Sequence, residues 1–276
     1  MKNQMKNNSE RKINKYFHQI IEIIKQPEIG VLPGQLAFYF LLSLVPLITI
    51  ACYAANLFEL DYSKIIHSLD VFIPGGFADV IPNITSTPVS ITMIVLMVWM
   101  LYIASNGCNT IIIISNNIYG IRQSTWVKRR IKAVFMTVMI IVFAIGLLVL
   151  SIYIVKTKTI LAGYQNGAEL IKYLKWIEYP LMFILLFLFL RLFYNFAPDR
   201  MRKTNHITIG TLFTSIGWTI ITVIYGIIAR HMYNYEIVFG GLANVALLMI
   251  WLYFISFIFV IGLALNYGEE KDEKKN

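Results

Sequence analysis

Long apolar runs alternate with short polar segments along the whole chain. Asp, Glu, Lys and Arg are absent from residues 29–58, 80–121, 133–155, 204–229 and 237–268. A sixth run, residues 179–196, is rich in Leu and Phe and contains Arg191 as its single charge. A helix needs about 20 mainly apolar residues to cross a bilayer, so each run is long enough to form one span.

These runs predict an all-α, polytopic membrane protein with six transmembrane helices. Lipid cannot satisfy backbone polar groups, so spanning segments must be helices or a closed barrel, and barrel strands would show alternating polarity. The apolar runs do not alternate in this way. The expected spans lie near residues 35–57, 91–114, 133–155, 179–196, 208–229 and 242–265. The predicted divisions are a tail over 1–34, a transmembrane domain over 35–265 and a charged tail over 266–276.

Two polar segments carry an amphipathic pattern. In the N-terminal tail, Ile13, Phe17, Ile20, Ile21 and Ile24 share one helical face, which indicates a helix lying on the inner membrane surface. The first external loop, over residues 62–82, predicts two short amphipathic helices separated by a Pro-Gly-Gly break. These helices could pack on the outer face of the bundle or form a lid over a cavity.

Composition and charge support the membrane assignment. The chain is 58% hydrophobic and only 14% charged, against roughly a quarter charged in ordinary soluble domains. Its formal net charge of +9 could indicate nucleic-acid binding, but the basic residues lie between the apolar runs.

The basic residues also predict the orientation. Most lie in the N-terminal tail, the second and fourth loops and the C-terminus, which the positive-inside rule places in the cytoplasm. We therefore expect a multi-pass cell-membrane protein with both termini cytoplasmic, membrane lipids as partners and no nucleic acid. The other side holds only Lys64, Lys156, Lys158, Lys172, Lys175 and Arg230.

Polar groups inside the apolar runs are the candidate functional residues. No Asp or Glu falls within a predicted span, which disfavours an antiporter built on buried carboxylates. Ser105, Asn109 and Asn116 share one stripe of their helix. This stripe could form hydrogen bonds between helices or line a polar cavity.

The other candidates are spread over several spans. Arg191, with Asn195 one turn away, could snorkel to the interface or contact an anion such as a lipid phosphate. Pro46 predicts a helix kink, and the hydroxyl of Ser43 could bond a carbonyl that the proline frees. Together the candidate pathway or substrate contacts are Ser43, Ser105, Asn109, Asn116, Arg191, Asn195, Asn244 and Asn266.

Familiar soluble chemistry is missing from the sequence. It contains no phosphate-binding loop, no H-E-x-x-H, no C-x-x-C and no G-x-S-x-G. The four histidines are scattered over different loops, so we expect no metal site, no cofactor and no catalytic residues. The chain is therefore not expected to be an enzyme.

Seven short motifs lie in order along nearly the whole chain beyond the tail. They are LAFYFLLSLVPL (36–47), Trp99 with Ser105, NNIYG (116–120), YNFAP (194–198), FGGLA (239–243), WLY (251–253) and GLALN (262–266). Together these segments resemble the YihY/BrkB family of bacterial inner-membrane proteins, some members of which were once labelled ribonuclease BN. The resemblance implies a six-helix inner-membrane protein with suggested roles in transport or envelope lipids.

The chain departs from the family pattern at two positions. Ala264 stands where the family often has Glu, and Asn195 stands where it often has Arg or Lys. Arg191, one turn away, offers a base in its place. The leading hypothesis is a transporter or lipid-translocating protein for a possibly anionic substrate. The alternatives are a non-transporting envelope scaffold and, less favoured, a membrane lipid enzyme; ribonuclease activity is not expected.

Overall fold

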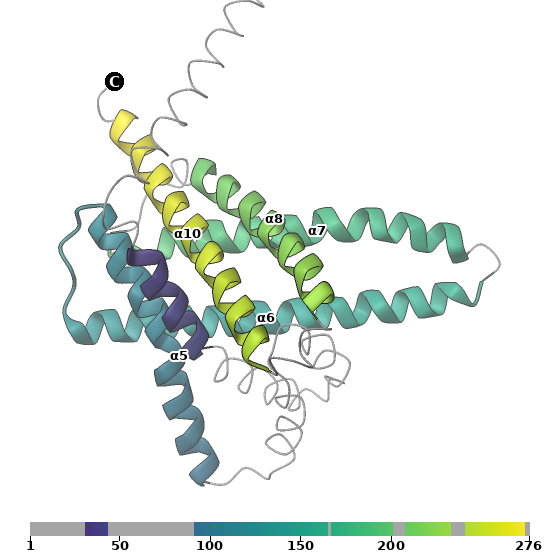
Figure 1. Ribbon diagram of the computed structural model, residues 1–276, viewed down its shortest axis with the longest axis horizontal. Coiled ribbons are helices and arrows are strands. Elements are labelled where there is room, and N and C mark those ends of the chain that lie inside the picture. The colour runs from purple at the N-terminus through teal and green to yellow at the C-terminus, as the bar shows by residue number, and fades with distance from the viewer. Residues whose placement is uncertain (1–30, 44–90, 165–166, 201–207, 233–240, 274–276) are drawn as a thin grey trace, which may run out of the picture.

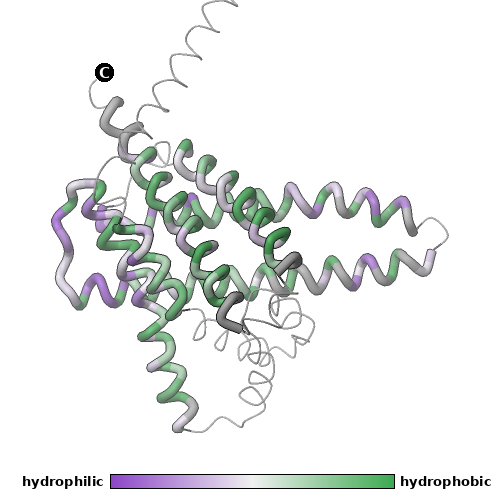
Figure 2. Tube along the Cα trace, in the orientation of Figure 1, coloured by the Kyte–Doolittle hydropathy of each residue, from purple (hydrophilic) through white to green (hydrophobic). Residues whose placement is uncertain are grey.

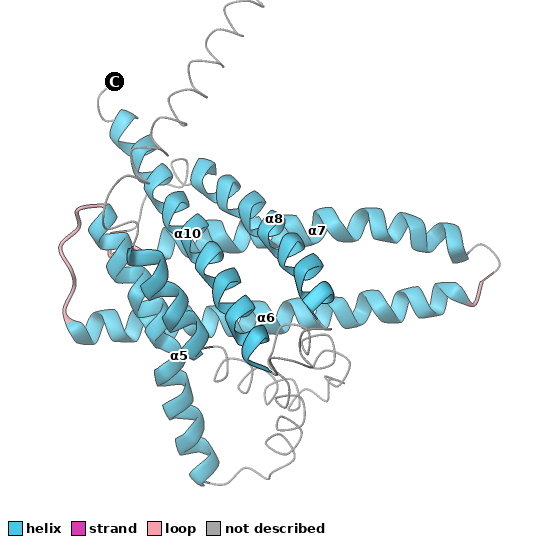
Figure 3. Ribbon diagram, in the orientation of Figure 1, coloured by secondary structure: helices cyan, strands magenta, loops and turns pink. Residues whose placement is uncertain are grey.

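The computed structural model describes residues 31–43, 91–164, 167–200, 208–232 and 241–273 (Figure 1). Every regular element among these residues is an α-helix and none is a strand (Figure 3). The predicted all-α fold is confirmed. The predicted N-terminal amphipathic helix, the amphipathic helices of the first external loop and the kink at Pro46 lie outside the described residues.

Five of the described helices are long and apolar enough to cross a membrane, so the chain is a multi-pass membrane protein. A shorter apolar helix, Val31–Ser43, covers the beginning of the first predicted span, whose remainder lies outside the described residues. The five long helices are α5 (Ile91–Ile118), α6 (Trp126–Ala162), α7 (Gly167–Phe196), α8 (Thr208–Met232) and α10 (Gly241–Glu273).

The helices extend beyond the predicted spans, most of all in α6 and α7. The sequence predicts a loop over residues 156–178 with a weaker amphipathic helical pattern; in the structure α6 continues to Ala162 and α7 begins at Gly167. No glycine or proline interrupts α6 between Gly146 and Gly163, so charged side chains alone do not end the helix. Similarly, α10 continues past the predicted boundary at residue 265 to Glu273.

The α6–α7 hairpin is longer than a bilayer is thick. The 37 residues of α6 span about 55 Å, against about 30 Å of hydrocarbon. The hairpin projects beyond the other labelled helices (Figure 1), and polar positions gather toward its tip (Figure 2). Two ion pairs join its helices: Lys132 bonds Asp199 just after α7, and Lys158 bonds Glu178 near the tip. Lys132 and Lys158 are 26 positions apart, or about 39 Å along α6.

Adjacent helices pack in the order of the chain. α5 packs on α6, α6 on α7, α7 on α8 and α8 on α10, while α10 also touches α5. The helix Val31–Ser43 enters the main core through Leu36, which is fully buried. The core is apolar and joins α5, α6, α7 and α10 through Cys108, Ile112, Met136, Phe193 and Phe259, among others.

Small residues let α8 and α10 approach each other closely. A Cβ atom at Gly210 would collide with the backbone carbonyl of Gly262, and one at Gly262 would collide with the hydroxyls of Thr214 and Tyr194. Close backbone approach at small residues is the common way in which membrane helices associate. Among the described glycines, those between α8 and α10 therefore mark the closest approach of two helices.

Candidate functional site

The connection between α5 and α6 turns sharply and leads back toward the end of α7. Gly120 has a φ of +60°, a conformation that favours glycine, and the Ile121 N–H bonds the Asn116 carbonyl oxygen at 2.8 Å. This turn brings Gln123 and Ser124 beside the last turn of α5.

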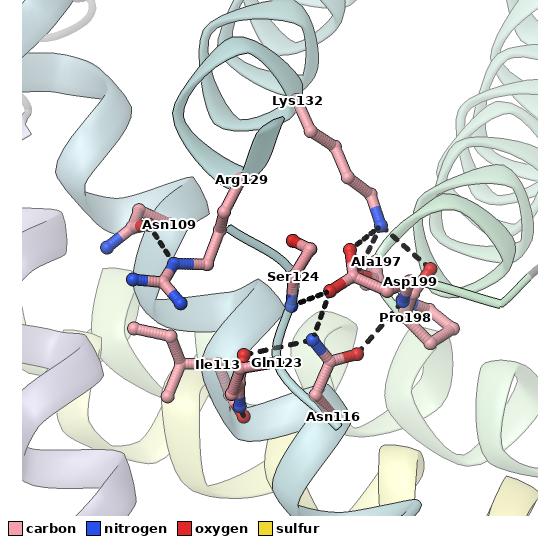
Figure 4. A network of polar contacts seen from close by, with 10 residues as sticks. All are labelled: Asn109, Ile113, Asn116, Gln123, Ser124, Arg129, Lys132, Ala197, Pro198 and Asp199. Carbon is pink, nitrogen blue, oxygen red and sulfur yellow. Dashed lines mark hydrogen bonds and ion pairs between the residues drawn. The ribbon is translucent and has the colours of Figure 1, made fainter. Parts of the chain in front are cut away.

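Asn116 forms a reciprocal pair with Asp199, which follows α7 (Figure 4). The Asn116 Nδ2 donates to Asp199 Oδ2 at 2.7 Å, and the Asp199 N–H donates to Asn116 Oδ1 at 2.9 Å. Nδ2 also donates to Gln123 Oε1 at 3.0 Å. Asn116 is fully buried, so its amide has exchanged water for these partners.

Asp199 accepts two further donors from the start of α6 and the segment before it. The Ser124 N–H bonds its Oδ2 at 3.1 Å and the Lys132 Nζ bonds its Oδ1 at 3.1 Å. Burial raises the pKa of Asp199, but the donors from Lys132, Ser124 and Asn116 outweigh it and hold that pKa below its ordinary value. We call Asn116, Gln123, Ser124, Lys132 and Asp199 the Asp199 network.

Lys132 also secures the end of α7. Its Nζ donates to the carbonyl oxygens of Ala197 at 3.0 Å and Pro198 at 2.7 Å. These groups lie beyond the last helical turn, where a cation also favours the negative end of the helix dipole. Gln123 binds the end of α5 in a similar way, because its Nε2 donates to the Ile113 carbonyl oxygen at 3.1 Å.

Two further amide side chains of α5, Asn106 and Asn109, meet arginines of α6. Arg129 Nε donates to Asn109 Oδ1 at 3.0 Å, and Arg130 donates to Asn106 Oδ1 at 2.8 Å. Basic residues at the start of α6 therefore satisfy the amides of α5 at two successive turns.

A second polar cluster joins α7, α8 and α10. The Tyr194 hydroxyl pairs with Thr214 Oγ1 at 2.6 Å and donates to the Phe259 carbonyl oxygen at 3.0 Å. Between α8 and α10, the Gly210 N–H also donates to Asn266 Oδ1 at 2.8 Å. Sequence reasoning treated Tyr194 only as part of a family motif and did not place it in this cluster.

The predicted site residues fall into separate groups. Asn116 belongs to the Asp199 network and Asn109 meets Arg129, whereas Asn266 lies in the second cluster. Ser105 donates to Tyr102 O within its own helix. Their roles as pathway contacts stay predictions.

The other predicted residues lie apart from the Asp199 network. Ser43 donates to the carbonyl oxygens of Tyr39 at 2.6 Å and Ala104 at 3.0 Å, the latter on α5. Arg191 and Asn195 are half-buried on α7. Asn244 belongs to α10, but its side chain lies outside what the structure describes.

Sequence reasoning missed Gln123, Ser124, Lys132 and Asp199. It searched for polar residues inside the predicted spans, whereas these four lie outside them. One signal was available: Asp199 is the only acid between Glu178 and Glu236 and follows directly after Ala197-Pro198. In the part of the chain that the structure describes, no group of three or more His, Cys, Asp or Glu side chains could hold a metal ion.

Comparison with known proteins identifies the family. The sequence model of the family Virulence factor BrkB matches residues 20–276. The chain belongs to this family. The resemblance seen in its sequence motifs is thereby confirmed, and the match begins within the N-terminal tail and covers all the described helices.

Two relatives illustrate the range of names that the family carries. The chain is 22% identical over 250 residues to the "Putative ribonuclease-like protein YfkH" of Bacillus subtilis, covering 87% of this chain and 90% of that protein. It is 25% identical over 256 residues to a "UPF0761 membrane protein" of Chromobacterium violaceum, covering 86% of this chain and 58% of that protein. No solved structure matches the chain.

Proposed function

We propose that this member of the BrkB family moves an anionic lipid or small anionic solute across the membrane. The observation that carries the proposal is the Asp199 network, which joins the α5–α6 connection to the ends of α5, α6 and α7 through hydrogen bonds and one ion pair. Water can replace such contacts at low cost at a membrane surface. The network can therefore open and close one end of the helix bundle.

The charge distribution supports an anionic rather than a cationic substrate. Residues 94–118, 133–155, 179–196, 208–229 and 245–267 contain no Asp or Glu and only Arg191 as a base. Buried carboxylates are the usual partners of cations and protons within membranes. A guanidinium offers a planar set of donors that suits phosphate or carboxylate oxygens.

The test is transport in proteoliposomes. Purified protein is reconstituted with a fluorescent phosphatidylglycerol in the vesicle lipid, and the loss of protected fluorescence after adding a membrane-impermeant reductant reports movement between leaflets. A parallel assay follows release of a trapped small anion. Flux in neither assay above protein-free vesicles would refute the proposal.

Two test variants and one control variant assign the function to residues. Asp199→Asn weakens the Asp199 network and should change the rate of lipid or anion flux in these assays several-fold. Glu178→Gln is the matched control, because it removes one carboxylate from the other α6–α7 ion pair, near the hairpin tip. Arg191→Ala should lower flux of the correct substrate; an unchanged rate at normal expression would remove Arg191 from the pathway.

A non-transporting scaffold is the second candidate function. It is favoured by the packing of the predicted pathway residues, since Ser43, Asn109 and Asn116 each bond other parts of the protein. The α6–α7 hairpin also extends beyond the bilayer thickness, where a partner could bind it. Stoichiometric co-purification of one membrane protein, together with no flux in vesicles, would favour this candidate.

We propose no ribonuclease activity, although one relative carries a ribonuclease-like name. Metal-dependent phosphodiester cleavage uses clustered carboxylates or histidines. The described helices and connections bring no such cluster together. Purified protein should leave RNA intact, and cleavage abolished by a point mutation in this chain would overturn the statement.

A further inference from the structure

One face of α5 presents a row of acceptors to the start of α6. Tyr102, Asn106 and Asn109 are spaced four and three residues apart, so they lie along one side of the helix. Arg130 donates to Asn106 Oδ1 at 2.8 Å and to the Tyr102 carbonyl oxygen at 2.6 Å. Arg129 donates to Asn109 Oδ1 at 3.0 Å. The two guanidinium groups are therefore fixed about one helical turn apart along α5.

These contacts leave much of the donor capacity of both arginines unused. A guanidinium has five N–H donors, and Arg129 uses only its Nε among the described residues. Arg130 uses one N–H on each terminal nitrogen. Its carbon Cζ also lies 3.5 Å from the centre of the Tyr102 ring, which fixes the plane of the guanidinium.

No carboxylate among the described residues contacts either guanidinium. The two ion pairs that the described chain forms are Lys132 with Asp199 and Lys158 with Glu178. The partners of Arg129 and Arg130 are neutral amides and a neutral carbonyl. Two adjacent positive charges of α6 thus lie against α5, and no carboxylate among the described residues is bonded to them.

The surrounding surface is apolar and faces outward. Val127, Ile131 and Phe135 follow one side of α6 at four-residue spacing and are exposed. Trp126 is 62% exposed at the first position of α6, and Trp99, which stacks on Tyr102, is 64% exposed. Exposed apolar stripes on a spanning helix face acyl chains. An anion that binds here must therefore tolerate an apolar surrounding.

We propose that Arg129 and Arg130 bind the phosphate of an anionic phospholipid at the crossing of α5 and α6. The phosphate oxygens accept N–H donors from the terminal nitrogens, since the Arg130 Nε is buried. The acyl chains lie along Val127, Ile131 and Phe135, the exposed stripe that borders Arg130 on α6. The start of α6 adds to the attraction, because Thr125 makes no side-chain capping bond and the helix dipole is positive there. The site is separate from Arg191 and does not depend on transport activity.

The test compares lipid retention by the purified full-length protein in detergent, measured by native mass spectrometry. Phosphatidylglycerol and phosphatidylcholine are added in matched amounts. Wild-type protein should retain phosphatidylglycerol selectively. Arg130→Gln should lower that retention about fivefold, since each basic residue near a membrane surface contributes roughly that factor toward anionic lipid.

Lys128→Gln is the matched control. It removes the same charge from the same turn of α6, but Lys128 is exposed and forms no hydrogen bond or ion pair with α5 among the described residues. Its retention of phosphatidylglycerol should stay close to that of the wild type. Equal losses in Lys128→Gln and Arg130→Gln would reduce the effect to general surface charge and overturn the site.

Arg130→Lys separates binding from folding, because it keeps the charge but not the planar set of donors. It should fold normally and show an intermediate loss. The wild-type comparison is independent of any variant: equal retention of the two lipids overturns the proposal. Displacement of bound phosphatidylglycerol by excess inorganic phosphate would indicate a soluble anion instead, and it would also overturn the lipid assignment.

Discussion

The contact between α8 and α10 makes Gly262→Ala the most informative single substitution for stability. A Cβ atom at position 262 would collide with the Thr214 hydroxyl oxygen and the Tyr194 hydroxyl oxygen. Those two hydroxyls bond each other at 2.6 Å in a fully buried position. The added methyl group must therefore separate α8 from α10, displace the Tyr194–Thr214 bond, or both.

The expected magnitude follows from comparison with Gly226→Ala on α8. A Cβ atom at Gly226 would meet nothing within 4 Å, so that variant isolates the effect of adding a methyl group to a helix. Both variants share the intrinsic helix-propensity gain of about 1 kcal/mol. Overpacking costs about 1–3 kcal/mol, and an interhelical hydrogen bond in a membrane contributes about 0.6 kcal/mol. Gly262→Ala should thus be less stable than Gly226→Ala by about 2–4 kcal/mol.

The assay is reversible unfolding by sodium dodecyl sulfate in mixed micelles, followed by tryptophan fluorescence. Trp218 is a suitable reporter because its Nε1 bonds the Ile255 carbonyl oxygen across the α8–α10 contact at 2.9 Å. Adding Thr214→Ala to Gly262→Ala should recover part of the loss, since it removes one of the colliding atoms. Equal stabilities of Gly262→Ala and Gly226→Ala would refute the packing of α8 on α10.

Three further predictions concern other parts of the molecule. The pKa of Asp199 lies below its ordinary value of 3.8, so its stabilising contribution is complete above that value and is lost as the pH falls through the lower, folded-state pKa. The difference in melting temperature between wild type and Asp199→Asn should be constant from neutral pH to about pH 5 and shrink below about pH 4; a difference that shrinks near neutral pH would contradict this. Tyr194→Phe removes two hydrogen bonds and should lower the free energy of unfolding by about 1 kcal/mol in the same detergent assay, against no change if the hydroxyl contributes nothing. For the orientation, a cysteine at Tyr164 should react with an impermeant maleimide added to intact cells, whereas one at Arg122 should react only after lysis; the reverse pattern would invert the predicted topology.

The sequence predicts the spanning segments well because the membrane imposes a length and a composition on each. The predicted fifth span, 208–229, coincides with the apolar part of α8. The interval between the third and fourth spans is predicted poorly. Lys156 and Lys158 mark where the chain leaves the hydrocarbon, but a helix in water tolerates lysine, so the charges do not mark where α6 ends.

The candidate site is only half predictable for a different reason. The stripe that contains Asn109 and Asn116 follows from helical spacing, and both residues do contact other elements. Their partners do not follow from any local pattern: Asp199 lies 83 positions from Asn116. The pairing depends on a turn at Gly120 and on how α6 and α7 pack, which are properties of the folded chain.

The two ion pairs of the α6–α7 hairpin have a consequence for how the protein responds to the bilayer itself. They lie about 39 Å apart along α6, close to the full thickness of a bilayer with its headgroups. Both ends of the hairpin are therefore fastened, and α6 and α7 cannot splay apart at one surface without breaking a pair. In a thinner membrane the two helices should accommodate hydrophobic mismatch by tilting together as a unit. Bilayer thickness would then alter the angle of the hairpin to the membrane and leave the angle between its helices unchanged.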